Sequence, residues 1–301
     1  MKILLLFLAL TPLAVSQAQT VLEWKFAPGE TQDYRLTQTA RLDSGVENAA
    51  TLIADIVQQI DFTWKVIEVN ADGTATISIK VNTFSLTATG PGGQEVAFDS
   101  SSSEDPQGYA AMLLPIGRRL SEEEVRLSMT PRGEVKLLDL PADLAEAVKS
   151  VPGGKLFAKD GGEGSFESLA RLGAPLTLPS EAISEGKGWT DTSEIDIPPL
   201  GNATVEFSYL VKQMQDDKPL SIDQAMHLSL EASEGETSLV LKEQVSTGVV
   251  QFDVSAGRPE KSTLSYQVEI VPQASQPEAS GGETMRLQQS VEFRSLSDAS
   301  Q

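Results

Sequence analysis

The chain has a single histidine, His227, the first residue to consider for acid–base or metal chemistry. The apolar alternation around it places Met226 and Leu228 on one side of a strand and His227 on the other. No second histidine completes a metal pair, and no cysteine supplies a thiolate ligand or nucleophile. A solvated surface histidine is therefore favoured over a catalytic one.

Short motifs of known enzymes do not occur. Gly-x-Ser-x-Gly and His-Glu-x-x-His are absent, and Pro152-Gly153-Gly154-Lys155 lacks the spacing of a phosphate-binding loop. Ser184 and Lys187 match Ser-x-x-Lys, a dyad that works when a helical turn brings the amine beside the hydroxyl. Because Gly186 and Gly188 flank the lysine, a turn is predicted there. The sequence thus names no catalytic, cofactor-binding or metal-binding residue.

Acidic residues are the remaining candidates, because a glycoside hydrolase needs only two suitably placed carboxyl groups. Three clusters stand out: Asp99 with Glu104-Asp105, Glu122-Glu123-Glu124, and Asp191 with Glu194 and Asp196. Among 43 acidic residues such clusters arise by chance, so solvated charge is the favoured interpretation. The stretch around Asp72-Gly73 approaches a calcium loop, but Ile79 stands where a bidentate acid is required. A carboxylate-dependent hydrolase remains an alternative.

The three tryptophans, Trp24, Trp64 and Trp189, are the aromatic candidates for lining a ligand pocket. Each lies at a strand position consistent with the core. Plain packing is therefore the favoured interpretation.

The elements that must position these residues are mostly strands, and residues 60–88 have the clearest pattern. Apolar and polar residues alternate on both sides of Asp72-Gly73, which predicts a β-hairpin. The phase of the alternation slips near Asn82-Thr83. Because a slip of one residue would turn the apolar face outward, we expect a β-bulge there.

Similar patterns predict further strands at 21–26, 34–42 and 52–61, and a hairpin at 125–138. A helical turn at 109–114 should end at Pro115, and helices are predicted at 141–150 and 165–172. Seven more strands are expected at 189–197, 203–213, 222–232, 237–245, 248–254, 262–271 and 284–293. Residues 272–282 are predicted to form a loop before the last strand.

These patterns predict a mainly β fold of antiparallel meander sheets with two or three short helices in the middle. The expected organisation is a signal peptide at 1–18, an N-terminal β half at 19–140, a helical connector at 141–175 and a C-terminal β half at 176–301. The sheets are predicted to curve, as in a half-barrel.

The N-terminus and the composition limit where the protein can be located and which partners it can bind. Lys2, a short apolar run and Ser16-Gln17-Ala18 are typical of a secretory signal peptide, which predicts export to the periplasm or beyond. Without cysteine, lipidation at a new N-terminus is not expected, and no further segment is long and apolar enough to span a membrane. The net charge of −20 predicts a soluble protein and disfavours nucleic acid as a partner.

Four pieces of the sequence together resemble a family of uncharacterised exported bacterial proteins of about 300 residues. They are Trp24-Lys25-Phe26-Ala27-Pro28-Gly29-Glu30 before Tyr34, Trp64-Lys65-Val66 before Asp72-Gly73-Thr74-Ala75, Leu178-Pro179 with Gly186-Lys187-Gly188-Trp189, and 248–253 with Gly257-Arg258. These are turn and core signatures, so the resemblance implies a fold and transfers no activity or functional residue.

A looser analogy of shape connects a curved sheet and short helices with the periplasmic lipoprotein carriers, in which helices cover a concave sheet that holds acyl chains. By that analogy the helices at 141–150 and 165–172 would form a lid. The favoured function is that of a non-catalytic envelope protein without a cofactor that binds an apolar ligand, such as a lipid, or an envelope protein partner. A structural or assembly subunit is the third alternative.

Overall fold

The computed structural model describes residues 20–45, 51–150, 176–197, 201–214, 218–230, 239–272 and 284–296. The predicted signal peptide, the predicted helix at 165–172 and nearly all of the predicted loop at 272–282 lie outside these ranges. The predicted fold class is confirmed, because the strands form one antiparallel sheet that does not close.

The sheet has the order β6-β5-β3-β2-β1-β12-β11-β10-β9-β8-β7, and β4 pairs with β3 beside this path. The first six strands are β1 (Thr31–Gly45), β2 (Thr51–Val69), β3 (Ala75–Thr89), β4 (Glu95–Asp99), β5 (Glu124–Met129) and β6 (Val135–Asp139). The last six are β7 (Gly188–Ile197), β8 (Gly201–Gln213), β9 (Leu220–Leu230), β10 (Leu239–Asp253), β11 (Arg258–Pro272) and β12 (Thr284–Ser295). The helices are η1 (Pro91–Gly93), η2 (Gly108–Leu113), α1 (Leu114–Glu122) and α2 (Ala142–Ser150). The pairing of β1 with β12 joins the two predicted β halves.

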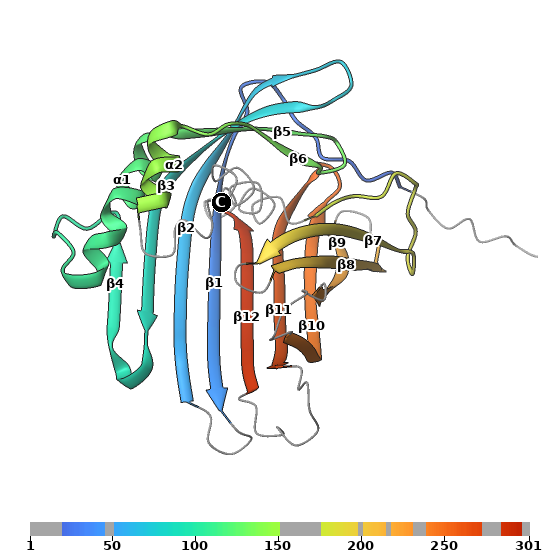
Figure 1. Cartoon of the computed structure of the whole chain (residues 1–301). Coiled ribbons are helices and arrows are strands. Elements are labelled where there is room, and N and C mark those ends of the chain that lie inside the picture. Colours follow the sequence, from blue (N-terminus) through green and yellow to red (C-terminus); the bar gives the residue numbers. More distant parts are fainter. Residues whose placement is uncertain are drawn as a thin grey trace, which may run out of the picture.

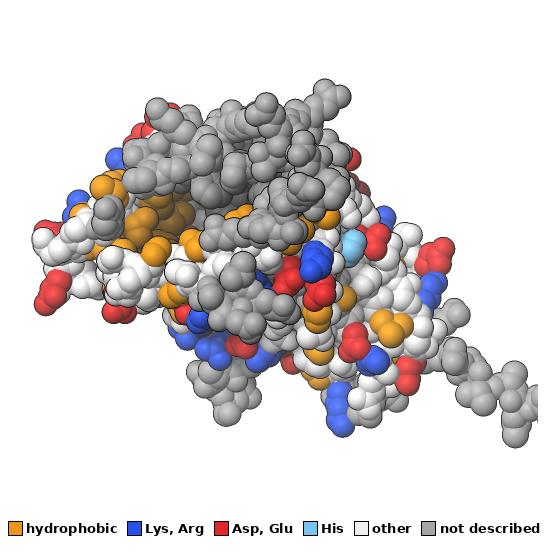
Figure 2. Space-filling view, turned by 60° about the horizontal axis from the view of Figure 1, so that its bottom comes forward, with side chains coloured by type: hydrophobic (Ala, Val, Ile, Leu, Met, Phe, Trp, Pro, Cys, Tyr) orange, Lys and Arg blue, Asp and Glu red, His pale blue; other side chains and the backbone are white. Residues whose placement is uncertain are grey.

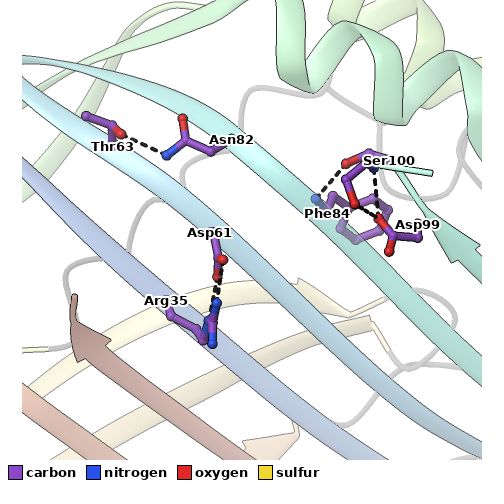
Figure 3. Close-up of polar contacts among 8 residues, drawn as sticks. Arg35, Asp61, Thr63, Asn82, Phe84, Asp99 and Ser100 are labelled. Atoms are coloured by element: carbon purple, nitrogen blue, oxygen red, sulfur yellow. Dashed lines mark hydrogen bonds and ion pairs between the residues drawn. The ribbon is translucent and has the colours of Figure 1, made fainter. Parts of the chain in front are cut away.

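The β2–β3 hairpin and its bulge form as predicted. In the turn, the Asn70 N–H donates to the Thr74 carbonyl over 2.8 Å, and the Asp72 carboxylate accepts from the Thr74 N–H. The register shifts by one residue at Asn82, which lies unpaired opposite β2. Its side chain donates to the Thr63 hydroxyl over 2.8 Å, as Figure 3 shows. The bulge thus keeps the apolar residues of both strands on one face.

Two of the seven strands predicted in the C-terminal half are one strand in the structure. Predicted strands 237–245 and 248–254 are joined in the continuous β10, so the gap predicted at 246–247 is wrong. A Cβ on Gly248 would collide with the Thr263 carbonyl and approach Gln224 Cγ to 2.9 Å. The glycine therefore permits close approach of neighbouring strands and does not mark a turn.

Two local predictions in the N-terminal half are also wrong. Pro115 does not end a helical turn but lies in the first turn of α1, where its missing N–H costs no intrahelical hydrogen bond. Residues 21–26 belong to no strand. They are held by single contacts, such as the Trp24 N–H donating to the Pro131 carbonyl over 2.7 Å.

The long strands β2, β1, β12, β11 and β10 lie side by side, with α1 and α2 beside β3 and with β7 and β8 crossing the sheet (Figure 1). We call the face that carries Tyr34, Phe62 and Phe293 the inner face. The opposite face is the outer face. Polar residues dominate the outer face and pair across strands: Arg35 donates two hydrogen bonds to Asp61, of 2.7 and 2.6 Å (Figure 3). This alternation fixes the register because a slip of one residue would exchange the faces.

The inner face is filled at one end of the long strands. Aromatic side chains of β1, β2 and β12 pack there, with Tyr34 stacked on Phe293 at 4.8 Å between ring centroids. Leu22, Leu176 and Leu178, from segments before β1 and before β7, cover them and are fully buried. We call this region the filled end.

Two smaller apolar clusters cover the inner face farther along the strands. On one side, β8 and β9 pack Val205 and Leu228 against Val268 of β11. On the other, η2 and α1 cover Phe84 and Phe98 of β3 and β4. The predicted lid helix α2 lies against α1. Between these clusters runs the remaining inner surface of β1 and β2.

Candidate functional site

His227 lies on β9, whereas Ser184 and Lys187 lie in the turn before β7. His227 is exposed on β9, while Leu228 is buried, as the alternation predicted. Lys187 donates to the Glu181 carboxylate over 2.7 Å and follows a turn in which Gly186 has a φ of +81°. The amine is therefore engaged by a carboxylate, and this pairing lowers the pKa of Glu181.

Asp99, from one of the acidic clusters, and Asp253, outside them, have pKa values shifted in the direction opposite to that of a general acid. The side-chain and backbone hydrogen bonds of Ser101 lower the pKa of Asp99. Burial alone would raise the pKa of Asp253, but bonds from the Ala256 N–H and from Ser255 lower it overall. A hydrolytic acid would need a raised pKa. Asp191 and Glu194 lie on β7, whose only strand partner in the described chain is β8, and charge on such an edge opposes edge-to-edge pairing.

The tryptophans lie in the core. Trp24 and Trp64 are buried at the filled end with ring centroids 6.1 Å apart, and Trp189 packs at the same cluster. The indole N–H of Trp24 donates to the Leu176 carbonyl, and that of Trp189 to the Thr177 carbonyl. All three side chains pack in or against the core, as predicted.

The best candidate site is the inner surface between the two smaller clusters, which the described segments leave uncovered. The strand register places five half-buried apolar residues on it, none of which belongs to the three buried clusters among the described residues. They are Ala40 and Leu42 of β1, Ala54 and Ile56 of β2, and Ala88 of β3. We call these five residues the floor. Hydrophobic side chains gather in a hollow at the left of Figure 2, the side on which Figure 1 shows β4 and α1.

Walls rise on both sides of the floor. Leu86 and Val96, next to the cluster under α1, flank it on one side, and Leu287 and Met285 of β12 flank it on the other. The distance from β3 to β12 is three strand spacings, or about 14 Å. The floor is thus wide enough to seat extended hydrocarbon chains along the strands.

The described strand positions around the floor carry no charge on the inner face. From Gln38 to the far end of the strands, the inner positions of β1, β2, β3, β11 and β12 hold no Asp, Glu, Lys or Arg. Charged residues make up 22% of the chain, and the outer positions of the same strands carry many of them. The inner surface is therefore suited to an uncharged, apolar ligand.

Strands β8 and β9 form one wall of the floor, and side chains of β10 hold β9 in place. Strands β9 and β10 pair only at residues 220–224 and 248–252. Beyond them, Gln244 bridges the gap by accepting from the Leu228 N–H over 2.9 Å and donating to the Leu228 carbonyl over 2.8 Å. The Tyr266 hydroxyl also donates to Gln244, and burial raises the pKa of Tyr266 to about 12, so this donor persists at an alkaline pH that would ionise an exposed tyrosine. The bridge joins β9 to β10 beyond the end of their backbone pairing, where Leu228 packs over the inner face against Val268.

A second hollow, of about 420 Å³, lies on the outer face. It crosses five strands, from Asp55 on β2 to Val245 on β10. Its wall residues are largely hydroxyl and amide side chains such as Thr39, Ser290 and Gln267, and most of these are exposed. It is an open, solvated surface without aromatic platforms on that face, and the inner floor is the stronger candidate.

Comparisons with known proteins show only weak likeness. No protein-family model and no curated protein sequence matches the chain. The chain is similar to lipovitellin, in a structure concerned with lipid–protein interactions, with 14% identity and a TM-score of 0.44 over 92% of this chain and 26% of that chain. DynF from the dynemicin pathway of Micromonospora chersina has 4% identity and a TM-score of 0.21 over 95% and 92%. OpdQ of Pseudomonas aeruginosa has 6% identity and a TM-score of 0.17 over 89% and 99%.

The chain therefore spans about a quarter of the lipovitellin chain, and all three TM-scores are too low to assign a ligand by likeness. In the described residues, no helix is long and apolar enough to cross a membrane. The same residues contain no group of three or more His, Cys, Asp or Glu that could hold a metal ion.

Sequence reasoning did not identify the floor residues as a site. Their alternation was visible and predicted a buried face. Which part of that face is covered depends on segments distant in the sequence, and these leave no local signal. The charge-free stretch of inner positions was the signal that could have indicated the site.

Proposed function

We propose that this protein is a non-catalytic, exported envelope protein that binds an apolar ligand with a hydrocarbon chain on the floor. The observation that carries the proposal is an apolar, charge-free and only half-buried surface between two packed walls. Apolar surface exposed to water in a sheltered trough gains free energy when an apolar ligand covers it. The lack of any raised carboxyl pKa among the shifted acids supports binding over hydrolysis.

The energetics predict a strong dependence on chain length. Burial of one methylene group contributes about 0.8 kcal/mol, which corresponds to roughly a fourfold change in the dissociation constant. The affinity for fatty acid methyl esters should therefore rise about fourfold with each added methylene until the chain exceeds the floor. Displacement of a fluorescent apolar probe measures this series directly.

Two neighbouring substitutions test the location. Ile56→Asp places a charge on the floor and should abolish binding of the esters, because the carboxylate would lose its hydration under the ligand. Val57→Asp is the matched control, because Val57 is the next residue of β2, faces outward and is 45% exposed. It should leave the affinity unchanged.

Native mass spectrometry of protein purified without detergent tests for an endogenous ligand. An excess mass that extracts into organic solvent is expected. Affinities that do not depend on chain length, or equal losses in both variants, would contradict the proposal. Those results would favour the alternative of a protein partner.

A further inference from the structure

Three glutamines interrupt the inner face next to the floor. The register puts Gln38 of β1 directly opposite Gln58 of β2, and Gln289 of β12 diagonal to Gln38. Opposite residues on one face of an antiparallel pair lie about 5 Å apart between Cβ atoms, and diagonal ones about 7–8 Å. Long side chains bridge both distances. The three amides thus form one cluster, which we call the glutamine cluster.

The amides of this cluster have no hydrogen-bond partners among the described residues. All three side chains are half-buried, yet none makes a side-chain hydrogen bond within the described part of the chain. Other inner glutamines are satisfied: Gln224 donates to Ser262 and Thr263, and Gln244 bridges β9. The amide atoms of Gln38, Gln58 and Gln289 are not fully buried, so they are accessible to water and available to a ligand that covers the floor. Such a ligand displaces this water and has to replace its hydrogen bonds, so a polar cluster beside an apolar floor points to a ligand with a polar group.

The cluster lies at the boundary of two apolar regions. Leu36 and Ile60, on the side of the filled end, and Ala40 and Ile56, on the side of the floor, flank it along β1 and β2. A ligand whose chain lies on the floor would therefore place a polar group here. Each amide offers two N–H donors and one carbonyl acceptor, which match ester carbonyls and hydroxyls.

The absence of charge restricts the polar group further. No Lys or Arg occupies an inner position near the glutamine cluster in β1, β2, β3, β11 or β12. A carboxylate or phosphate buried there would lack a cation, and its desolvation would oppose binding. A neutral carbonyl or hydroxyl would meet its partners at no such cost.

We propose that Gln38, Gln58 and Gln289 bind the uncharged polar group of an acyl ester, so that the ligand is a neutral lipid and not a free fatty acid. This inference rests on the proposed function and specifies the class of ligand for the same site. An acylglycerol has the required combination of hydrocarbon chain, ester carbonyl and hydroxyl.

The test compares three probes on the full chain: monopalmitoylglycerol, palmitate at pH 8 and hexadecane. Unaltered protein should bind the glycerol ester at least tenfold more tightly than palmitate, because only palmitate carries a charge. The variant Gln38→Leu/Gln58→Leu/Gln289→Leu should bind the ester about 10–100-fold more weakly, since two or three hydrogen bonds of about 0.5–1.5 kcal/mol are lost. Its affinity for hexadecane should remain or increase.

A control variant uses glutamines on the outer face of the same strands. Gln59→Leu/Gln288→Leu should leave the affinities for all three probes unchanged. An unchanged affinity for the ester in the triple variant, or a preference for palmitate, would overturn this inference while leaving the proposed function intact. Failure of unaltered protein to bind either the ester or hexadecane would instead overturn the proposed function.

Discussion

The filled end and the floor are two parts of the same strands with opposite outcomes. Both follow the same alternation along β1 and β2, and both present apolar residues inward. At the filled end these residues are large aromatics such as Tyr34 and Trp64, and they are buried. On the floor they are mostly small or aliphatic, such as Ala40 and Ile56, and they are half-buried.

The comparison shows that the two-residue period of a strand determines which side chains point inward. The size of these side chains, and whether other segments cover them, determines whether the region is a core or a binding surface. The filled end needs its aromatic rings, each of which buries about 150–250 Å², and it needs the leucines of two distant segments to close it. The floor residues belong to no buried cluster, and the residues that flank them belong to two separate clusters. One region is a core, and the other is a surface suited to a ligand.

The largest effect should come from truncation at the filled end. Phe293→Ala removes a ring that is 1% exposed and stacked on Tyr34, and should lower the free energy of unfolding by about 3–5 kcal/mol. Ile56→Ala on the floor should lower it by only about 1 kcal/mol, because Ile56 is half-buried. Chemical denaturation of both variants measures the contrast. Equal losses would show that the floor is as tightly packed as the core.

An intermediate effect should follow from weakening one wall of the floor. Gln244→Ala leaves the N–H and carbonyl of Leu228 without partners and should cost about 2 kcal/mol of stability. It should also weaken ester binding, because β9 would lose its anchor on β10. Gln267→Ala, an exposed substitution on β11, is the control and should change stability by less than about 0.5 kcal/mol. A loss no greater than that of the control would mean that the bridge does not hold the wall.

The smallest effect, and the sharpest contrast, should come from adding volume. Ala40→Phe would cover part of the floor and should stabilise the ligand-free protein by about 1 kcal/mol while blocking ester binding. Ala75→Phe adds the same ring at the filled end, where Ala75 is fully buried, and should destabilise by about 1–3 kcal/mol. Thermal unfolding and probe displacement check both variants. Destabilisation by Ala40→Phe would indicate that the floor has no free space.

The amino-acid sequence by itself determined the local structure. The alternation in 60–88 with Asp72-Gly73 specified the β2–β3 hairpin, and the slip of phase specified the bulge at Asn82. The alternation around His227 specified its exposure. These features depend on neighbouring residues and on the two-residue period of a strand, so they are visible without the fold.

Other local predictions failed where the tertiary structure gave a residue a different role. A gap between strands was predicted at 246–247, just before Gly248, yet β10 is continuous there and the glycine permits close approach to Thr263 and Gln224. Pro115 was predicted to end a helical turn, yet it lies in the first turn of α1. Glycine and proline are compatible with both roles, and only the surrounding chain selects between them.

The tertiary structure alone decided where the inner face is covered. The sequence specified which residues point inward, but Leu22, Leu176 and Leu178 close the filled end from segments far apart along the chain. The bridge of Gln244 to Leu228 joins β9 to β10 where Leu228 packs over the face, at one wall of the floor. Whether a side chain is buried depends on which segments pack against it. Contacts between segments distant in the sequence produce no periodic pattern, so the sequence does not reveal them.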